Sequence, residues 1–295
     1  MSLLELLADN PPLWLATAGL LGLVIGSFLN VVILRLPVMM ERDWRAQAAA
    51  AEGREAEPEE PFNLLVPRSR CPNCGTAIRS WQNVPVLSYV LLRGRCAECA
   101  TPIGVRYPVV EALTGLLSVL VAWRFGATPE ALAALVFTWT LIALSVIDLD
   151  HQLLPDALTL PLLWLGLLLS LWHGTVTGSA LFVTPRDAII GGAAGYLSLW
   201  SVYHLFRLAT GKEGMGYGDF KLLAALGAWL GWQMLPLIIL LSAAVGAVVG
   251  IALIVLTRRG RDVPIPFGPY LAAAGWIALM YGRQIMDSYL GIWQG

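Results

Sequence analysis

The chain has 295 residues, of which 57% are hydrophobic and only 13% charged, and its mean hydropathy is +0.69. A soluble domain carries about 25% charged residues, so this composition excludes a water-soluble globule and a disordered chain. The net charge of −1 predicts no nucleic-acid partner. Repeated apolar stretches near the ~20 residues that cross a lipid bilayer predict a polytopic membrane protein instead.

Apolar runs bounded by charged or turn residues predict an all-α fold with about eight transmembrane helices. The first is expected to be a retained anchor, because the segment MSLLELLADNPP before it lacks the basic residues of a signal peptide. The sixth is the least secure, since it is short and joins the seventh through Gly231 and Trp232. The predicted spans are residues 12–34, 108–123, 130–147, 157–173, 188–206, 220–232, 235–256 and 267–286.

The distribution of basic residues predicts the orientation in the membrane. With eight spans, sixteen of the 19 basic residues fall on one side, and cytoplasmic segments are enriched in Lys and Arg. Both termini are therefore predicted to face outward, on the side away from the cytoplasm. The segments predicted to face the cytoplasm are 35–107, 148–156, 207–219 and 257–266. The predicted domains are a first span at 1–34, a cytoplasmic loop domain at 35–107 and a seven-span membrane domain at 108–295.

All four cysteines lie in the long loop, as two CxxC pairs separated by 21 residues. This spacing lets two tight turns present four thiolates to one tetrahedral Zn²⁺. Two disulfides are the competing interpretation, but the loop is predicted to face the reducing cytoplasm. A redox role is disfavoured because no βαβ pattern surrounds either pair. The predicted ligands of a structural zinc ion are Cys71, Cys74, Cys96 and Cys99.

Two carboxylates stand at the ends of apolar runs, where an ionisable group needs a partner or a function. Asp148 ends LIALSVID, and Asp219 follows a glycine-rich turn. Each lies where an odd-numbered span connects to the next even-numbered one, and these connections are all predicted to face the cytoplasm. Gly216 and Gly218 in that turn permit unusual backbone angles and close approach of another segment. If the two carboxylates meet, they share one proton, so that one could deprotonate water while the other protonates the scissile group. Helix capping or an ion pathway remains an alternative.

Other residues receive structural interpretations. Asp156 follows Pro155 at the start of the fourth span and is expected to cap that helix. Three glycine pairs have the GxxxG spacing that permits close helix contacts. These pairs are Gly22 with Gly26, Gly191 with Gly195, and Gly246 with Gly250.

Six motifs, in order along the chain, resemble those of the type IV prepilin peptidases. They are GSFLNVVILRLP at 26–37, RSRCPNCG at 68–75, WQNVPVLSYVLLRGRCAEC at 81–99, RYPVVEALTG at 106–115, IDLDHQLLPD at 147–156 and GYGDFKLLAALG at 216–227. By this resemblance, Asp148 and Asp219 match the catalytic aspartates of the family, and the four cysteines match its zinc ligands. The resemblance covers nearly the whole chain.

The resemblance implies cleavage of the basic leader of type IV prepilins and type II secretion pseudopilins, after Gly and on the cytoplasmic side. It also implies N-methylation of the new terminus, with S-adenosylmethionine as the methyl donor, which nothing else in the sequence predicts. The methyl-transfer machinery is expected in the long loop. Its candidate residues, for which interfacial anchoring or helix packing is the alternative, are Asn30, Arg35, Arg106, Tyr107 and Glu111.

Two other classes of protein fit parts of the pattern. A proton-coupled transporter also places acids on apolar helices, but it would need them near the bilayer midplane. A membrane assembly scaffold with a zinc module would share the cysteine pairs, but it would tolerate substitution of both aspartates.

Overall fold

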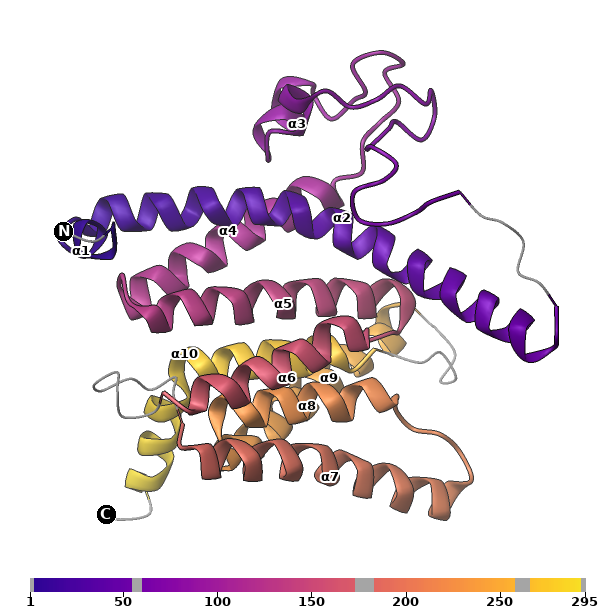
Figure 1. Ribbon diagram of the computed structural model, residues 1–295. Helices are drawn as coiled ribbons and strands as arrows, with labels where there is room; N and C mark the ends of the chain where they lie inside the picture. Colours follow the sequence, from indigo (N-terminus) through magenta and orange to yellow (C-terminus); the bar gives the residue numbers. More distant parts are fainter. Residues whose placement is uncertain (1–2, 55–59, 173–182, 258–265, 293–295) are drawn as a thin grey trace. The chain divides into compact units, whose positions relative to one another are not determined.

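The computed structural model describes residues 3–54, 60–172, 183–257 and 266–292 (Figure 1). Within these residues all regular elements are helices, accompanied by two isolated β-bridges. A helix lies at each of the eight predicted spans, so the expected all-α fold is confirmed. The elements are α1 (Leu3–Ala8), α2 (Pro11–Ala51), η1 (Ser80–Asn83), α3 (Leu87–Leu91), α4 (Arg106–Phe125), α5 (Pro129–His151), α6 (Asp156–Ser170), α7 (Pro185–Thr210), α8 (Tyr217–Leu230), η2 (Trp232–Met234), α9 (Leu235–Thr257) and α10 (Gly268–Ile292).

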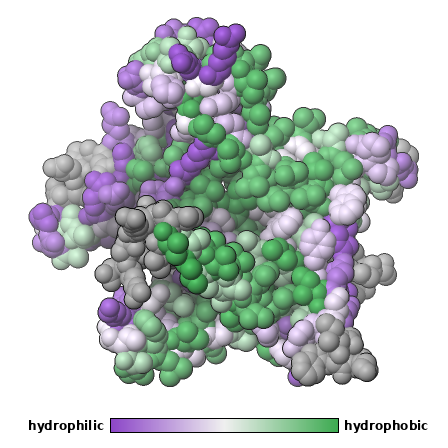
Figure 2. All heavy atoms as spheres, turned by 180° about the vertical axis from the view of Figure 1, so that it is seen from behind, coloured by the Kyte–Doolittle hydropathy of each residue, from purple (hydrophilic) through white to green (hydrophobic). Residues whose placement is uncertain are grey.

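Several helices are suited to a bilayer. In the described part of the chain, four stretches are long and apolar enough to cross a membrane, namely Pro11–Ala51, Arg106–Phe125, Pro129–His151 and Trp232–Leu253. Figure 2 shows hydrophobic side chains over much of the visible face, as expected where lipid replaces water as the solvent. The chain is therefore a multi-pass membrane protein.

The predicted sixth and seventh spans are separate helices. Gly231 lies between α8 and η2 with φ +82°, a left-handed conformation that glycine adopts without steric cost. Its N–H still donates to the carbonyl of Gly227, which closes the last turn of α8. The chain then re-enters a helix through η2 and α9.

Helix α2 extends beyond the predicted first span. It continues from Pro11 to Ala51, past the predicted end at residue 34, and contains Pro37 in its interior. A proline inside a helix lacks the N–H for one hydrogen bond and bends the axis, and α2 changes direction along its length in Figure 1. Charged residues from Glu41 to Arg45 are suited to a helical extension into water.

The chain forms two compact units, Met1–Ala131 and Leu132–Gly295. In the first unit, α2 packs along α4. A Cβ atom on Gly22 would overlap Ser118, and one on Gly26 would lie 2.7 Å from the Cα of Glu111. The predicted close contact of the first glycine pair is therefore confirmed.

In the second unit, α8 is the central helix and contacts α6, α7 and α10. Every residue of α8 from Leu222 to Leu230 is buried. The second glycine pair faces it, since a Cβ on Gly191 would overlap the carbonyl of Gly227 and one on Gly195 would lie 2.5 Å from the carbonyl oxygen of Leu223. The absence of side chains at this pair lets α7 lie against the α8 backbone.

Substitution of adjacent glycines on α7 provides a matched test of this packing. Gly191→Ala is expected to lower the free energy of unfolding by about 1–3 kcal/mol, the usual cost of overpacking. Gly192→Ala is expected to leave it unchanged or to raise it by up to about 1 kcal/mol, because the nearest atom to a new Cβ there is 3.7 Å away. Thermal unfolding in detergent measures the difference, and equal stability of the two variants would contradict the predicted packing.

Candidate active site and cysteine cluster

Asp148 and Asp219 come together at one end of the second unit. Asp148 lies near the end of α5 and Asp219 in the first turn of α8. Both are buried, with exposed fractions of 5% and 6%, and they are close enough for the charge of Asp148 to act on Asp219. Two buried carboxylates whose charges interact disfavour each other's ionised form, so that one of them can hold a proton while the other is charged. The arrangement therefore has the parts needed for paired acid and base catalysis.

A backbone donor holds one of the two carboxylates. The N–H of Gly268, the first residue of α10, donates to Oδ2 of Asp148 at 3.0 Å in a buried hydrogen bond. Gly268 was not among the residues predicted from the sequence. The only signal was the Gly-Pro dipeptide, Gly268 with Pro269, at the start of an apolar run, a pattern common at helix starts.

The glycine-rich turn before Asp219 has one clear steric role. A Cβ on Gly218 would lie 2.7 Å from the Cβ of Leu154, so this glycine lets the α5–α6 connection approach α8. Gly216 has ordinary extended angles, φ −84° and ψ 154°, and a Cβ there would approach nothing closer than 3.9 Å. The expected unusual backbone is therefore absent at Gly216, and the described geometry gives no steric reason for a glycine there.

Asp156 forms an ion pair, and the expectation that it caps α6 is wrong. The capping position is Pro155, which makes no side-chain cap. The Asp156 carboxylate instead accepts two hydrogen bonds from Lys221 Nζ, at 2.6 and 2.7 Å. Because Lys221 follows Asp219 by two residues, this pair joins the starts of α6 and α8 beside the aspartates.

Three aromatic side chains pack together next to Asp219. The rings of Tyr217 and Phe220 lie 5.3 Å apart, and Tyr203 of α7 contacts both at 5.5 and 5.7 Å. Ring pairs in this range are attractive beyond the area that they bury. The cluster therefore fixes the first turn of α8 against α7.

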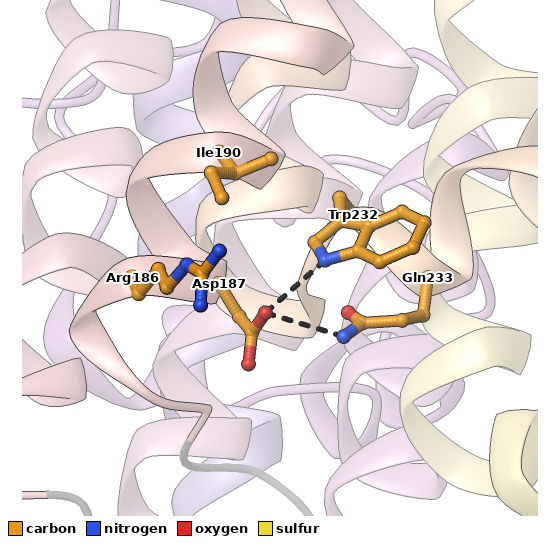
Figure 3. A pocket seen from close by; sticks show the side chains of 5 residues that line it. All are labelled: Arg186, Asp187, Ile190, Trp232 and Gln233. Atoms are coloured by element: carbon orange, nitrogen blue, oxygen red, sulfur yellow. Dashed lines mark hydrogen bonds between the residues drawn. The ribbon is translucent and has the colours of Figure 1, made fainter.

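A separate pocket lies at the other end of α8. It has a volume of about 460 Å³ and contains Asp187, which accepts hydrogen bonds from Trp232 Nε1 at 3.1 Å and Gln233 Nε2 at 3.2 Å (Figure 3). Trp232 follows the end of α8, whereas Asp219 is in its first turn, and a helix of 14 residues is about 20 Å long. This pocket is therefore distinct from the aspartate site.

The four cysteines of the first unit form one cluster. Their Sγ atoms all lie within 4.8 Å of one another, and the Cys71 and Cys99 sulfurs are 3.7 Å apart. Tetrahedral coordination with Zn–S bonds of about 2.3 Å places the sulfurs about 3.8 Å from each other. The cluster could therefore hold a metal ion, and the Cys71–Cys99 distance matches the one expected around zinc.

Each cysteine pair sits in the same kind of turn. The N–H of Cys71 donates to the carbonyl of Thr76, and that of Cys96 donates to the carbonyl of Thr101, both at 2.9 Å. An isolated β-bridge closes each turn, Arg70 with Ala77 and Arg95 with Pro102. The sequence signal for this repeat is the match between CPNCGT at 71–76 and CAECAT at 96–101, which was not used in the prediction.

The threonine side chains also lower the pKa of two of the cysteine thiols. The Thr101 hydroxyl, 3.2 Å from the Cys99 sulfur, lowers the pKa of Cys99 to about 6. A hydrogen bond with Thr76 similarly lowers the pKa of Cys74. Since the thiolate is the form that binds metal, these contacts prepare the cluster for a cation at neutral pH.

Comparison with known proteins covers both units. Residues 20–125 match the bacterial peptidase A24 N-terminal domain, and residues 135–251 match the type IV leader peptidase family. The chain is 56% identical over 291 residues to the prepilin leader peptidase/N-methyltransferase of Pseudomonas aeruginosa, with 98% of both chains covered. The protein of the same name from Aeromonas hydrophila is 57% identical over 290 residues, again with 98% of both covered. No solved structure shows a significant match.

The chain belongs to the type IV leader peptidase family. The resemblance seen in the motifs is confirmed, and the chain is an enzyme. In this leader peptidase the buried aspartate pair lies in the second unit, within the region matched by the peptidase family. The cysteine cluster lies within the region matched by the N-terminal domain.

Two candidate methyl-transfer residues of the leader peptidase are buried and hydrogen-bonded. Asn30 donates from Nδ2 to the carbonyl of Tyr107 at 3.1 Å, which ties α2 to the start of α4. Glu111 accepts the N–H of Val86 at 2.7 Å through Oε2. Val86 has φ +58°, an uncommon conformation for a β-branched residue, and the buried carboxylate holds it in place.

The other three candidates lie where the loop meets these helices. Arg35 donates to the carbonyls of Asn63 at 2.8 Å and Pro67 at 2.6 Å, and so fastens the loop to α2. Arg106 begins α4, followed by the exposed Tyr107. The five candidates therefore share one region of the first unit, where α2, α4 and the loop join.

Gly75 and Ala100 occupy equivalent places in the two cysteine turns and provide a test of the repeat. Both have positive φ, +70° and +56°, which costs a residue with a side chain about 1–2 kcal/mol. After the cluster is loaded with added Zn²⁺, Gly75→Ala is expected to speed release of the metal to a coloured chelator, and Ala100→Gly to slow it, each by roughly five-fold for about 1 kcal/mol. Nothing lies within 4 Å of a Cβ on Gly75, so packing does not complicate the comparison. Slower release from Gly75→Ala would contradict the prediction.

Proposed function

We propose that this enzyme is a membrane-embedded aspartic endopeptidase. Its substrates would be type IV prepilins and type II secretion pseudopilins, from which it removes the basic leader after Gly. The observation that supports this proposal most strongly is the meeting of Asp148 and Asp219, two buried carboxylates from helices that are distant in the sequence. The printed names of the relatives support the same substrate class.

In the proposed reaction, one aspartate acts as general base and the other as general acid. The base takes a proton from water, whose oxygen attacks the carbonyl carbon of the scissile peptide. The acid protonates the carbonyl oxygen, which gives a diol. As the C–N bond breaks, the base gives the proton that it took from water to the leaving amine, and the acid regains a proton from a hydroxyl of the diol. Because Oδ2 of Asp148 already accepts the Gly268 N–H, we place the water beside its other oxygen.

We propose that the aspartates face the cytoplasm in the bacterial inner membrane, with both termini outside. The end of α5 and the starts of α6, α8 and α10 contribute to the aspartate site and its neighbours. If eight spans cross the membrane in alternating directions, the end of α5 and the starts of α6, α8 and α10 all lie on the same side. The proposed domains remain a first span at 1–34, a loop domain at 35–107 and a seven-span peptidase domain at 108–295.

We also propose that the enzyme N-methylates the residue exposed by cleavage, with S-adenosylmethionine as donor. The relatives carry N-methyltransferase in their names. The cysteine cluster would hold one structural Zn²⁺ that orders the loop, as its sulfur spacing permits. The residues proposed to position the methyl-transfer reactants are Asn30, Arg35, Arg106, Tyr107 and Glu111.

Intact-mass analysis tests both proposed activities together. The purified enzyme in detergent is incubated with a prepilin that carries its basic leader, with and without S-adenosylmethionine. We expect loss of the leader in both samples and the added mass of one methyl group only with the donor. Leader loss without methylation would contradict the second activity alone, whereas an intact prepilin would contradict the peptidase proposal. A transporter or scaffold would leave the prepilin intact.

A further inference from the structure

We infer that Gly268 is a positioning residue of the active site, where its backbone N–H and its lack of a side chain set the place of the Asp148 carboxylate. The inference rests on the proposed peptidase function and adds a third chain segment, the start of α10, to the site. Gly268 acts through Asp148.

The hydrogen bond holds one oxygen of the carboxylate. As the first residue of α10, Gly268 has an N–H with no acceptor in its own helix. Asp148 Oδ2 supplies that acceptor at 3.0 Å, and both residues are buried. A carboxylate at a helix start is also favoured by the helix dipole. The contact fixes one oxygen of Asp148 and leaves the other available for reaction.

The structure also leaves no space for a side chain at position 268. A Cβ on Gly268 would lie 2.6 Å from Asp148 Oδ2, and 3.0 and 3.1 Å from the two terminal carbons of Leu154. Gly268 is not among the described glycines with positive φ. A glycine is needed here because the carboxylate occupies the space beside it, and not because of the backbone angle.

Leu154 links this contact to the second aspartate. Its Cβ lies 2.7 Å from where a Cβ on Gly218 would be, and Gly218 precedes Asp219. Leu154 is buried between the start of α8 and the start of α10. The absence of side chains at the two glycines therefore lets one leucine pack between the segment that carries Asp219 and the segment that holds Asp148.

Kinetics of leader cleavage test the inference. Gly268→Ala is expected to lower kcat by about 100-fold, the loss that a misplacement of about 1 Å causes, with KM changed less than about threefold because the variant leaves leader binding intact. Gly192→Ala, which introduces the same methyl group at an open position of α7, is expected to retain the wild-type rate. Wild-type kcat in Gly268→Ala would overturn the inference.

A double variant distinguishes the effect of the contact with Asp148 from the effect of the contact with Leu154. Leu154→Ala removes the terminal carbons near Gly268 but keeps the Asp148 carboxylate in the chain. We expect that adding Gly268→Ala to Leu154→Ala lowers kcat as much as it does in the wild type. Recovery of activity in the double variant would assign the effect to Leu154 and overturn the role of Asp148.

The exchange rate of the Gly268 amide hydrogen tests the same contact without an activity assay. It also does not require the Gly268→Ala variant to fold. Asp148→Ala removes the acceptor and is expected to speed exchange at Gly268 by about tenfold or more, as for a hydrogen bond of about 1.4 kcal/mol. Asp148→Asn keeps a carbonyl oxygen and is expected to preserve slow exchange. Equal exchange in the two variants would overturn the inference even if the wild type cleaves prepilins, whereas a wild type that cleaves nothing would contradict the proposed function itself.

Discussion

Asp148→Asn and Asp219→Asn are each expected to lower the rate of leader cleavage by about 10³-fold or more. General acid–base catalysis contributes about 10²–10⁴-fold, and each variant removes a group that must gain and lose a proton in every turnover. An Asn side chain has almost the same shape as Asp, so binding of the prepilin should change little. Initial rates of leader release, measured over a range of prepilin concentrations, separate kcat from KM.

Asp150→Asn is the matched control for these variants. It makes the same chemical change two residues beyond Asp148 on α5, but Asp150 is exposed. We expect wild-type cleavage from this variant. Residual activity above about one tenth of wild type in either buried variant would be too large for the loss of a general acid or base, and would contradict the assigned roles.

Loss of the cysteine cluster is expected to separate the two proposed activities. Cys71→Ser removes one sulfur from the cluster, so bound zinc should fall to a small fraction of one ion per chain. Methyl transfer should drop roughly 10–100-fold, the range seen when the surroundings of a metal are altered. Leader cleavage should stay near wild type, because the aspartates and the cysteines belong to different compact units.

Elemental analysis and the prepilin mass assay measure these effects on the same samples. Chelation of the wild-type enzyme should reproduce the Cys71→Ser result, and added zinc should restore methylation to the chelated enzyme but not to the variant. Full methylation by protein that contains no metal would contradict the proposed role of the cluster. Loss of cleavage together with methylation would show that the cluster also supports the peptidase unit.

The sequence was sufficient to place the helices, because a bilayer demands long apolar runs that hydropathy reveals directly. The sequence did not give the end of a helix that continues beyond the apolar region. Helix α2 continues to Ala51, since residues beyond 34 favour a helix in water as well as in lipid, and only the hydropathy changes there. Gly231 was visible as a break in the sequence, but its φ of +82° was needed to separate α8 from α9.

Contacts between distant segments were beyond the sequence pattern. The parity of the spans put Asp148 and Asp219 on one face, but their approach depends on how α5 and α8 pack. Lys221 as the partner of Asp156 is a contact of the same kind, and a carboxylate after Pro155 reads locally as a helix cap. Gly268 was missed because a backbone N–H leaves no mark in the sequence.

The central claim is that this aspartate pair uses water directly to cut the prepilin. The most direct test is intact-mass analysis of products formed in isotopically labelled water with a metal chelator present. We predict that the wild-type enzyme releases a leader with one labelled oxygen in its new carboxylate and that no leader–enzyme adduct accumulates. Asp148→Asn and Asp219→Asn should each release leader about 10³-fold more slowly or not at all. A covalent adduct, or labelled leader released by either variant at the wild-type rate, would contradict the claim.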